Sequence, residues 1–110
     1  MKRALIVRKV WLDKIFDEGK VWEMRSSYTY VRGQIGMIES RSGLIVGSAE
    51  LIRCSQWPIQ KIPMFKQFHK IEDLSLIDKW PYAWVLSNAK RFDKPIPYIH
   101  PKGAVIWVKL

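Results

Sequence analysis

The chain has 110 residues, and its 48% hydrophobic and 26% charged residues are the balance of a folded domain, which excludes a disordered tail or a fibrous repeat. This length allows one hydrophobic core but not two, so we expect a single domain over residues 1–110. The single cysteine, Cys54, excludes an internal disulfide. Nineteen Lys and Arg against ten Asp and Glu give a net charge of +9, which favours a polyanionic partner such as nucleic acid. A basic surface without a specific partner is the alternative.

Neither a membrane span nor a secretion signal is expected. The longest apolar run, residues 104–108, is far shorter than the ~18 residues of a transmembrane helix. No segment has the pattern of a basic amphipathic helix with a wide apolar face, so binding to a membrane surface is not expected either. The apolar run at residues 4–7 is too short for the core of a signal peptide. We therefore expect a cytoplasmic protein.

The first quarter of the chain predicts a strand, a helix and a second strand. Residues 4–7 form a short apolar run that is typical of a buried strand. Residues 10–18 have the spacing of an amphipathic helix, which Gly19 would end. Residues 21–26 then alternate, with Trp22 and Met24 on one face of a strand and Glu23 and Arg25 on the other.

The rest of the chain predicts mostly strands with short helical insertions. A hairpin is expected from residues 34–39 and 43–53, whose second strand has small residues at Gly47 and Ala49 where another element can approach closely. Short helices are predicted within residues 64–71 and 74–79, and the second ends before Pro81. Two strands follow, at residues 82–91 and 104–110, joined by an extended connector that contains three prolines at 94–101.

These elements predict an α+β domain. Five to six strands with two to three short flanking helices fit a small mixed β-barrel, because closure of the sheet removes its exposed edges. Metal and cofactor sites are not expected: the sequence has no CxxC, HxxxH, HExxH, P-loop or GxGxxG motif, and no nucleophile-elbow signature. We expect both histidines, His69 and His100, to be structural or surface residues.

One charged cluster has a spacing that suggests a binding site. Strand alternation places Glu23 and Arg25 on one face about 7 Å apart, with Lys20 entering from the preceding turn. A carboxylate at Glu23 can accept from the amino edge of a base, while the two cations can hold phosphate or ribose oxygens. An exposed ion pair worth at most ~1 kcal/mol is the alternative interpretation.

The same residues carry a family resemblance. The segment Gly19-Lys20-Val21-Trp22-Glu23-Met24-Arg25 resembles the G-x-K-x-x-E-x-R signature of ASCH domains, with the glycine one position closer to the lysine. The similarity continues through residues 30–36, 43–51, 82–86, 94–98 and 103–107, and so covers nearly the whole chain. The resemblance implies a PUA-like barrel whose cleft, between barrel and helices, binds RNA or nucleotides and is lined by the Lys–Glu–Arg motif.

The resemblance also implies an enzymatic alternative. Some small bacterial relatives are amidohydrolases that remove the acyl group of N4-acetylcytidine with a Lys base, a Thr nucleophile and a distant Glu. Lys20 matches that lysine, but Glu23 stands where the threonine would be, so a covalent acyl-enzyme route lacks its nucleophile. Lys20 and Glu23 would then be the catalytic pair for activating water, and Glu72 or Asp73 could supply the third carboxylate. RNA cleavage, which is linked to other relatives, is less favoured because no acid–base pair of histidines is evident.

Aromatic and basic residues supply the remaining candidates. Trp22, Trp84 and Trp107 fall in mid-strand and are expected in the core. Among the aromatics predicted in loops, which also include Tyr30, Trp57 and Trp80, Tyr28 and Tyr98 are our candidates for stacking on a base. Basic residues near the proline connector predict either a phosphate track or a solvated rim: Lys90, Arg91, Lys94 and Lys102. Our main hypothesis is therefore an RNA- or nucleotide-binding module with no metal or cofactor.

Overall fold

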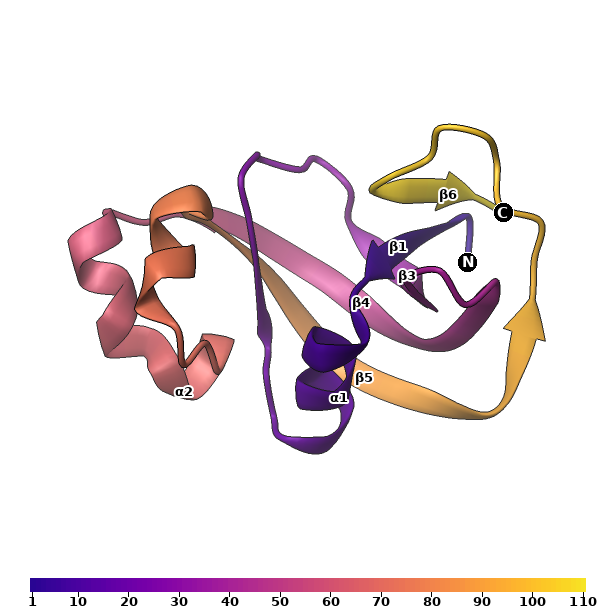
Figure 1. The fold of residues 1–110 in the computed structure, drawn as a ribbon, viewed down its shortest axis with the longest axis horizontal. Coiled ribbons are helices and arrows are strands. Elements are labelled where there is room, and N and C mark those ends of the chain that lie inside the picture. The colour runs from indigo at the N-terminus through magenta and orange to yellow at the C-terminus, as the bar shows by residue number, and fades with distance from the viewer.

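Six strands form one mixed sheet in the order β2-β5-β4-β3-β1-β6, in a computed structural model that describes residues 1–110 (Figure 1). Strands β1 and β3 are parallel, and every other neighbouring pair is antiparallel. The α+β class and the number of strands that the sequence predicts are confirmed. The strands are β1 (Arg3–Val7), β2 (Trp22–Arg25), β3 (Gly33–Glu39), β4 (Leu44–Gln56), β5 (Tyr82–Pro97) and β6 (Trp107–Lys109).

The helical segments lie in two places. Helix α1 (Lys9–Asp17) follows β1 and buries Leu12 and Ile15, the apolar side that the sequence predicts. The segments between β4 and β5 gather at one end of the molecule, away from the two termini (Figure 1): the 3-10 helix η1 (Ile59–Phe65), the short helix α2 (Lys66–His69) and the 3-10 helix η2 (Leu74–Lys79). No helix is both long and apolar enough to cross a membrane.

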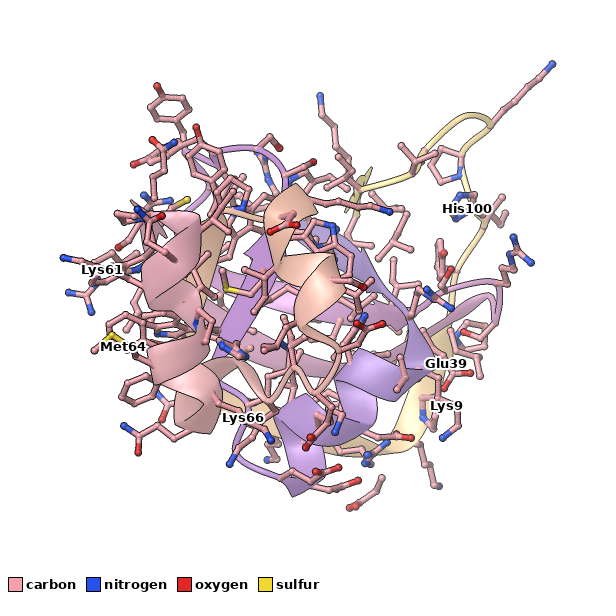
Figure 2. The ribbon with its side chains drawn as sticks, turned by 60° about the vertical axis from the view of Figure 1, so that its left-hand side comes forward. Lys9, Glu39, Lys61, Met64, Lys66 and His100 are labelled. Carbon is pink, nitrogen blue, oxygen red and sulfur yellow. The ribbon has the colours of Figure 1, made fainter.

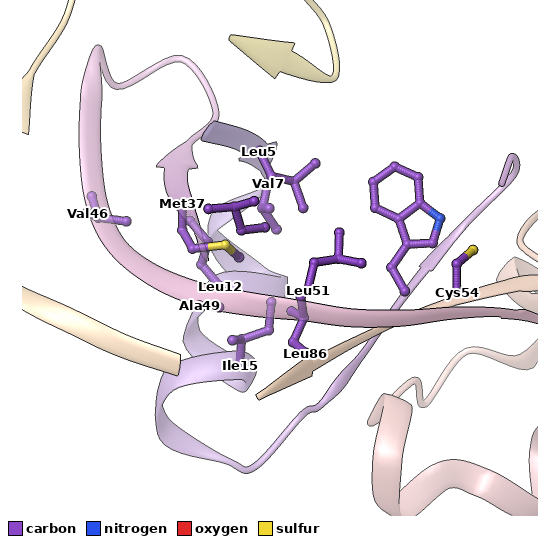
Figure 3. Packing of buried hydrophobic residues seen from close by; sticks show 12 residues of the cluster. Leu5, Val7, Leu12, Ile15, Met37, Val46, Ala49, Leu51, Cys54 and Leu86 are labelled. Carbon is purple, nitrogen blue, oxygen red and sulfur yellow. The ribbon is translucent and has the colours of Figure 1, made fainter. Parts of the chain in front are cut away.

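Two apolar clusters account for most of the core. The larger lies inside the curled sheet and includes Leu12 and Ile15 of α1 together with side chains from β1, β3, β4 and β5 (Figure 3). The second lies under the η1–α2–η2 segments and contains Trp22 and Met24 of β2. Because successive side chains of a strand point to opposite faces, burial of these two residues turns Glu23 and Arg25 the other way.

The structure corrects three predicted boundaries. The proline connector is wrong for residues 94–97, since β5 continues to Pro97 and pairs there with Leu44 of β4. Prolines are tolerated there because β2 covers β5 only at residues 82–85, so the far half of β5 is an edge strand. The last strand begins at Trp107 rather than at residue 104, because Ala104 closes a turn on the carbonyl of Pro101. The helix expected within residues 64–71 is α-helical only at Lys66–His69.

The barrel stays open at one seam. The sheet order leaves β2 at one end and β6 at the other, with β1 next to β6, so no ladder of backbone hydrogen bonds joins the two ends. A side chain crosses the seam instead: Nη2 of Arg25 donates to the carbonyl of Ile6, 2.9 Å away. The open seam is where the candidate site lies.

Candidate functional site

A pocket of about 310 Å³ occupies the seam between the sheet ends and the helical segments. Strand β2 and the residues after it form one wall, and Ile6 with residues 105–106 forms the opposite wall. Three indole side chains, those of Trp11, Trp80 and Trp84, line it together with charged groups. The volume is at the lower end of the roughly 300–1,000 Å³ that is typical of ligand pockets.

Lys20 lies almost fully buried at this pocket, with 1% of its side chain exposed. Its Nζ donates to the carbonyl of Trp22 at 2.6 Å and to the carbonyl of His69 at 2.7 Å. The same nitrogen lies 3.7 Å from Oε1 of Glu23. It also lies 5.1 Å from the ring centroid of Trp11, which is within range of a cation–π interaction. The ammonium group is therefore held by two carbonyl dipoles, an aromatic face and one carboxylate.

Burial lowers the pKa of Lys20 to about 8, because loss of water disfavours the charged form. The carboxylate of Glu23 opposes this change, since a nearby negative charge favours the ammonium form. Arg25 and Lys14 push the pKa further down by charge repulsion. A lysine with a pKa of about 8 can exchange a proton more readily near physiological pH than an ordinary lysine.

Glu23 and Arg25 do lie on one face, as the alternation of β2 predicts, and they are paired. Nε and Nη2 of Arg25 both contact Oε2 of Glu23, at 3.0 and 2.8 Å. The exposed fraction is 5% for the Glu23 side chain and 19% for that of Arg25, so the alternative of an exposed ion pair is wrong. The guanidinium also lies 5.4 Å from the ring centroid of Trp84. Oε1 of Glu23 accepts no hydrogen bond, and Nη1 of Arg25 donates none.

His69 supports the site from behind rather than taking part in it. Its Nε2 is 2.9 Å from the carbonyl of Ile62, to which it must donate, so Nδ1 is the acceptor for the backbone N–H of Ile71, also at 2.9 Å. Both ring nitrogens are thereby used, and burial lowers the pKa of this imidazole. The structural role that the sequence suggests for His69 agrees with this geometry. The histidine fixes the backbone whose carbonyl binds Lys20.

The aromatic wall of the pocket differs from the predicted one. Trp11 and Trp80 meet edge to face, with centroids 6.0 Å apart, and both line the pocket. Trp11 belongs to the apolar pattern of a helix, and nothing in that pattern distinguishes a pocket wall from a core. Trp84 is buried as expected, but its edge also reaches the pocket, and its Nε1 donates to the carbonyl of Ser27.

The other predicted site residues lie outside this pocket. Tyr28 packs against Tyr30 and Tyr82, and Arg91 pairs with Asp13 and Asp17 of α1. Glu72 pairs with Lys66 at the surface, and Asp73 accepts from Ser75 at the start of η2.

Tyr98 lines a neighbouring hollow that is described below. None of these side chains lines the pocket, nor do Lys90, Lys94 and Lys102. Arg8, Ser26, Ser27 and Ser40 do so instead, without a distinguishing sequence pattern.

No group of three or more His, Cys, Asp or Glu side chains is arranged to hold a metal ion. The polar groups of the pocket are instead one lysine, one Glu–Arg pair, a second arginine and three serines. Such a set can donate and accept hydrogen bonds and can hold an anion, while Trp11 and Trp80 add apolar aromatic surface. Chemically, the pocket suits a small planar polar group that carries a negative charge.

Fold and site together define a small mixed-sheet domain with a buried Lys–Glu–Arg cluster at the open seam of its barrel. The family model of the ASCH domain matches residues 5–96, and the chain belongs to that family. Solved structures agree. The chain is similar to an ASCH protein from Zymomonas mobilis, with a TM-score of 0.76 at 13% identity over 98% of this chain and 86% of that one.

Two single-substitution variants of the Zymomonas mobilis protein have the same fold likeness. They give TM-scores of 0.76 and 0.73, each at 13% identity over 98% of this chain and 87% and 88% of theirs. At this identity the likeness concerns the fold. No curated protein matches the sequence.

Proposed function

We propose that the pocket binds one nucleotide of single-stranded RNA, with Glu23 and Arg25 contacting the edge of its base. The observation that carries this proposal is a pair of polar atoms that form no hydrogen bond within the chain, on two largely buried side chains. Oε1 of Glu23 accepts no hydrogen bond, and Nη1 of Arg25 donates none, although both side chains line the pocket. An acceptor and a donor in the same pocket suit the hydrogen-bonding edge of a nucleobase, which carries both kinds of group.

The indole side chains support a planar ligand. Trp11 of α1, Trp80 just after η2 and Trp84 of β5 converge on one pocket of about 310 Å³. Stacking of a base on an aromatic ring contributes about 1–3 kcal/mol. Trp84 is held in place by its hydrogen bond to Ser27, by the stacked ring of Trp107, whose centroid is 5.8 Å away, and by Arg25 over its ring, so it presents its edge to the pocket and leaves stacking to Trp11 and Trp80. Rigid walls reduce the entropy that is lost on binding.

The charge of the pocket supports a ligand with a phosphate. Two buried or half-buried cations, Lys20 and Arg25, share the single carboxylate of Glu23, and Arg8 adds a third positive charge without an ion-pair partner. The lining is therefore positive overall, in keeping with the net charge of +9 of the chain. A positive site attracts the phosphates of RNA and makes the affinity depend on salt.

Quenching of tryptophan fluorescence is a direct test, because three indoles line the pocket. The protein is titrated with each nucleoside 5′-monophosphate and with a short single-stranded RNA. Both kinds of ligand are expected to quench the fluorescence, and the logarithm of RNA affinity should fall with the logarithm of salt by about 0.7 per phosphate neutralised. Glu23→Gln, which keeps the shape of the side chain, should weaken binding and alter the preference among the four bases. Unchanged binding in this variant would show that Glu23 does not contact the base.

The lowered pKa of Lys20 favours a second candidate, hydrolysis of an N4-acylated cytidine. At a pKa of about 8, part of the Lys20 population is neutral near pH 7 and able to accept a proton from water as it attacks the amide carbonyl. Incubation with N4-acetylcytidine, followed by chromatography for cytidine, tests this candidate. Lys20→Met is the matched control because it has a similar length and no amine. Equal release of cytidine by both proteins would exclude hydrolysis at Lys20.

A further inference from the structure

Two open hollows continue from the pocket along the surface. The first, which we term the rim hollow, is lined by Arg8, Lys9, Val10, Ser40 and Arg41. The second, the Tyr98 hollow, has a volume of about 400 Å³ and is lined by residues that include Arg41, Tyr98, His100 and Val105. Ser40 lines all three depressions, and Ile6 and Val105 line both the pocket and the Tyr98 hollow. The three depressions therefore adjoin one another around Ser40.

The two hollows are positively charged and contain no acidic group. No carboxylate lines either of them, whereas Arg8 and Arg41 are exposed and form no ion pair. Lys9 is already paired with Asp13 at 2.7 Å, which leaves the two arginines as the free cations. Arg41 has a positive φ of 67°, a conformation that an arginine adopts at some cost in the turn between β3 and β4. This turn carries the guanidinium to the boundary of both hollows.

The Tyr98 hollow has an aromatic wall with a fixed orientation. Nε2 of His100 must donate to the carbonyl of Ala104, 2.8 Å away, so Nδ1 accepts from the hydroxyl of Tyr98 at 2.7 Å. The two rings have centroids 5.8 Å apart at an interplanar angle of 61°. The backbone N–H of Tyr98 donates to the carbonyl of Gly43, which ties this wall to the β3–β4 turn. A ring held in this way is suited to stacking on a base.

We propose that the Tyr98 hollow binds the nucleotide next to the one in the pocket. Arg8 and Arg41, at the rim hollow between the two subsites, bind the phosphate that links the two nucleotides. Tyr98 and His100 contact the second base. This inference rests on the proposed function and names the ligand class more closely: single-stranded RNA of at least two nucleotides, rather than a free nucleoside. The Lys–Glu–Arg cluster and the Tyr98 hollow are then two parts of one binding groove.

The test compares a mononucleotide with a short single-stranded RNA in variants of the outer subsite. Arg41→Asn removes the charge while retaining a residue that tolerates a positive φ. Lys61→Asn removes one charge from η1, on the side of the molecule away from His100 (Figure 2), and serves as the charge-matched control. Tyr98→Leu removes the ring but keeps an apolar side chain, and its thermal unfolding is measured to check that it folds.

We expect the RNA to bind at least about tenfold more tightly than the mononucleotide. Arg41→Asn should weaken RNA binding and reduce its salt dependence by about 0.7, the contribution of one phosphate, while leaving mononucleotide binding unchanged. Tyr98→Leu should weaken RNA binding roughly 5- to 100-fold, the equivalent of one stacked base. Lys61→Asn should have a much smaller effect than Arg41→Asn.

Two results would overturn this inference while leaving the proposed function intact. One is RNA that binds no more tightly than the mononucleotide. The other is an Arg41→Asn variant that behaves like Lys61→Asn. If neither ligand binds at low salt, the proposed function itself is wrong, and a second nucleotide subsite is then excluded as well.

Discussion

The side chain of Arg25 on β2 donates to the backbone carbonyl of Ile6 on β1, 2.9 Å away, although the two strands share no ladder. Arg25 therefore connects the two ends of the sheet across the seam at which the pocket opens. The same guanidinium holds Oε2 of Glu23, while Oε1 lies 3.7 Å from Nζ of Lys20 and accepts no hydrogen bond. Stability of the seam and polarity of the pocket thus depend on one side chain, which makes Arg25 a sensitive position for mutation.

Arg25→Met is expected to lower the free energy of unfolding by about 3 kcal/mol. The change leaves Glu23 buried without its hydrogen bonds, and breaking one side of a buried ion pair costs about that much. Denaturation with urea measures the effect. Arg53→Met, at an exposed position of β4 without an ion pair, is the control and should change stability by less than about 0.5 kcal/mol. Adding Glu23→Gln to Arg25→Met should recover part of the loss, and a loss as small as that of the control would contradict the role of Arg25.

Lys20 is expected to titrate with a pKa of about 8, well below its ordinary value of 10.5. The measurement is the 13Cε chemical shift of the lysines as a function of pH, in which Lys20 should be the outlier. Since Glu23 favours the charged form, Glu23→Gln should lower the pKa of Lys20 further. An ordinary lysine titration for every Lys would contradict the buried position of Lys20.

The same pKa makes stability depend on pH. Because the pKa of Lys20 is lower in the folded chain, the unfolded chain holds more protons between about pH 8 and 10.5, and the free energy of unfolding rises with pH across that window. Relative to Lys20→Met, the wild type should gain on the order of 2 kcal/mol between about pH 7 and 10. The comparison removes the contributions of the other titrating groups, which the two proteins share. A constant difference between them would contradict the prediction.

Because His69 is buried, we expect the stability of the fold to depend on pH below neutrality as well. Burial lowers the pKa of this imidazole below 6.5, so the folded chain resists protonation and stability falls as pH decreases through that value. Protonation would also remove the acceptor for the N–H of Ile71. The melting temperature of the wild type should therefore fall more between about pH 7.5 and 5 than that of His69→Gln. Parallel curves would show that His69 titrates alike in the folded and unfolded chains.

We expect that any side chain at Gly47 destabilises the fold for steric reasons. A Cβ atom at this position would lie 2.4 Å from the carbonyl oxygen of Lys90 and 2.5 Å from Cζ of Phe16. Gly47→Ala should therefore destabilise the fold by about 3 kcal/mol, the upper range for overpacking. Gly43→Ala is the control: its Cβ would meet no atom within 4 Å, so only the positive φ of 72° opposes it, at about 1 kcal/mol. Equal losses in the two variants would mean that both Phe16 and the backbone at Lys90 move away from residue 47 without cost.

Much of the fold could be predicted because the signals are local. The helix at residues 10–18, the hairpin and the close approach at Gly47 all follow from periodicity and side-chain size, and the structure confirms them. The end of β5 could not be predicted in this way. Two prolines in its last residues, Pro95 and Pro97, exclude a helix, but only the sheet order shows that this half of the strand has a free edge.

The candidate site was likewise predictable only in part, where local alternation decides it. Alternation along β2 placed Glu23 and Arg25 on one face, but it could not show whether that face is exposed to solvent or buried. Burial of the pair depends on Ile6, Trp84 and the helical segments, all distant in sequence. The basic residues near the prolines illustrate the opposite outcome: Arg91, expected at the site, is used by Asp13 and Asp17 of α1.

The class of domain, its basic charge and the shared face of Glu23 and Arg25 can be inferred from the chain alone, because they depend on composition, on periodicity and on the two-residue repeat of a strand. Three features of the site follow only from the fold: Lys20 is buried, His69, 49 residues away in the chain, supplies one of its acceptors, and Trp11 and Trp80 form the wall. They could not be inferred because curling of the sheet, and not local conformation, sets which distant groups meet at the seam.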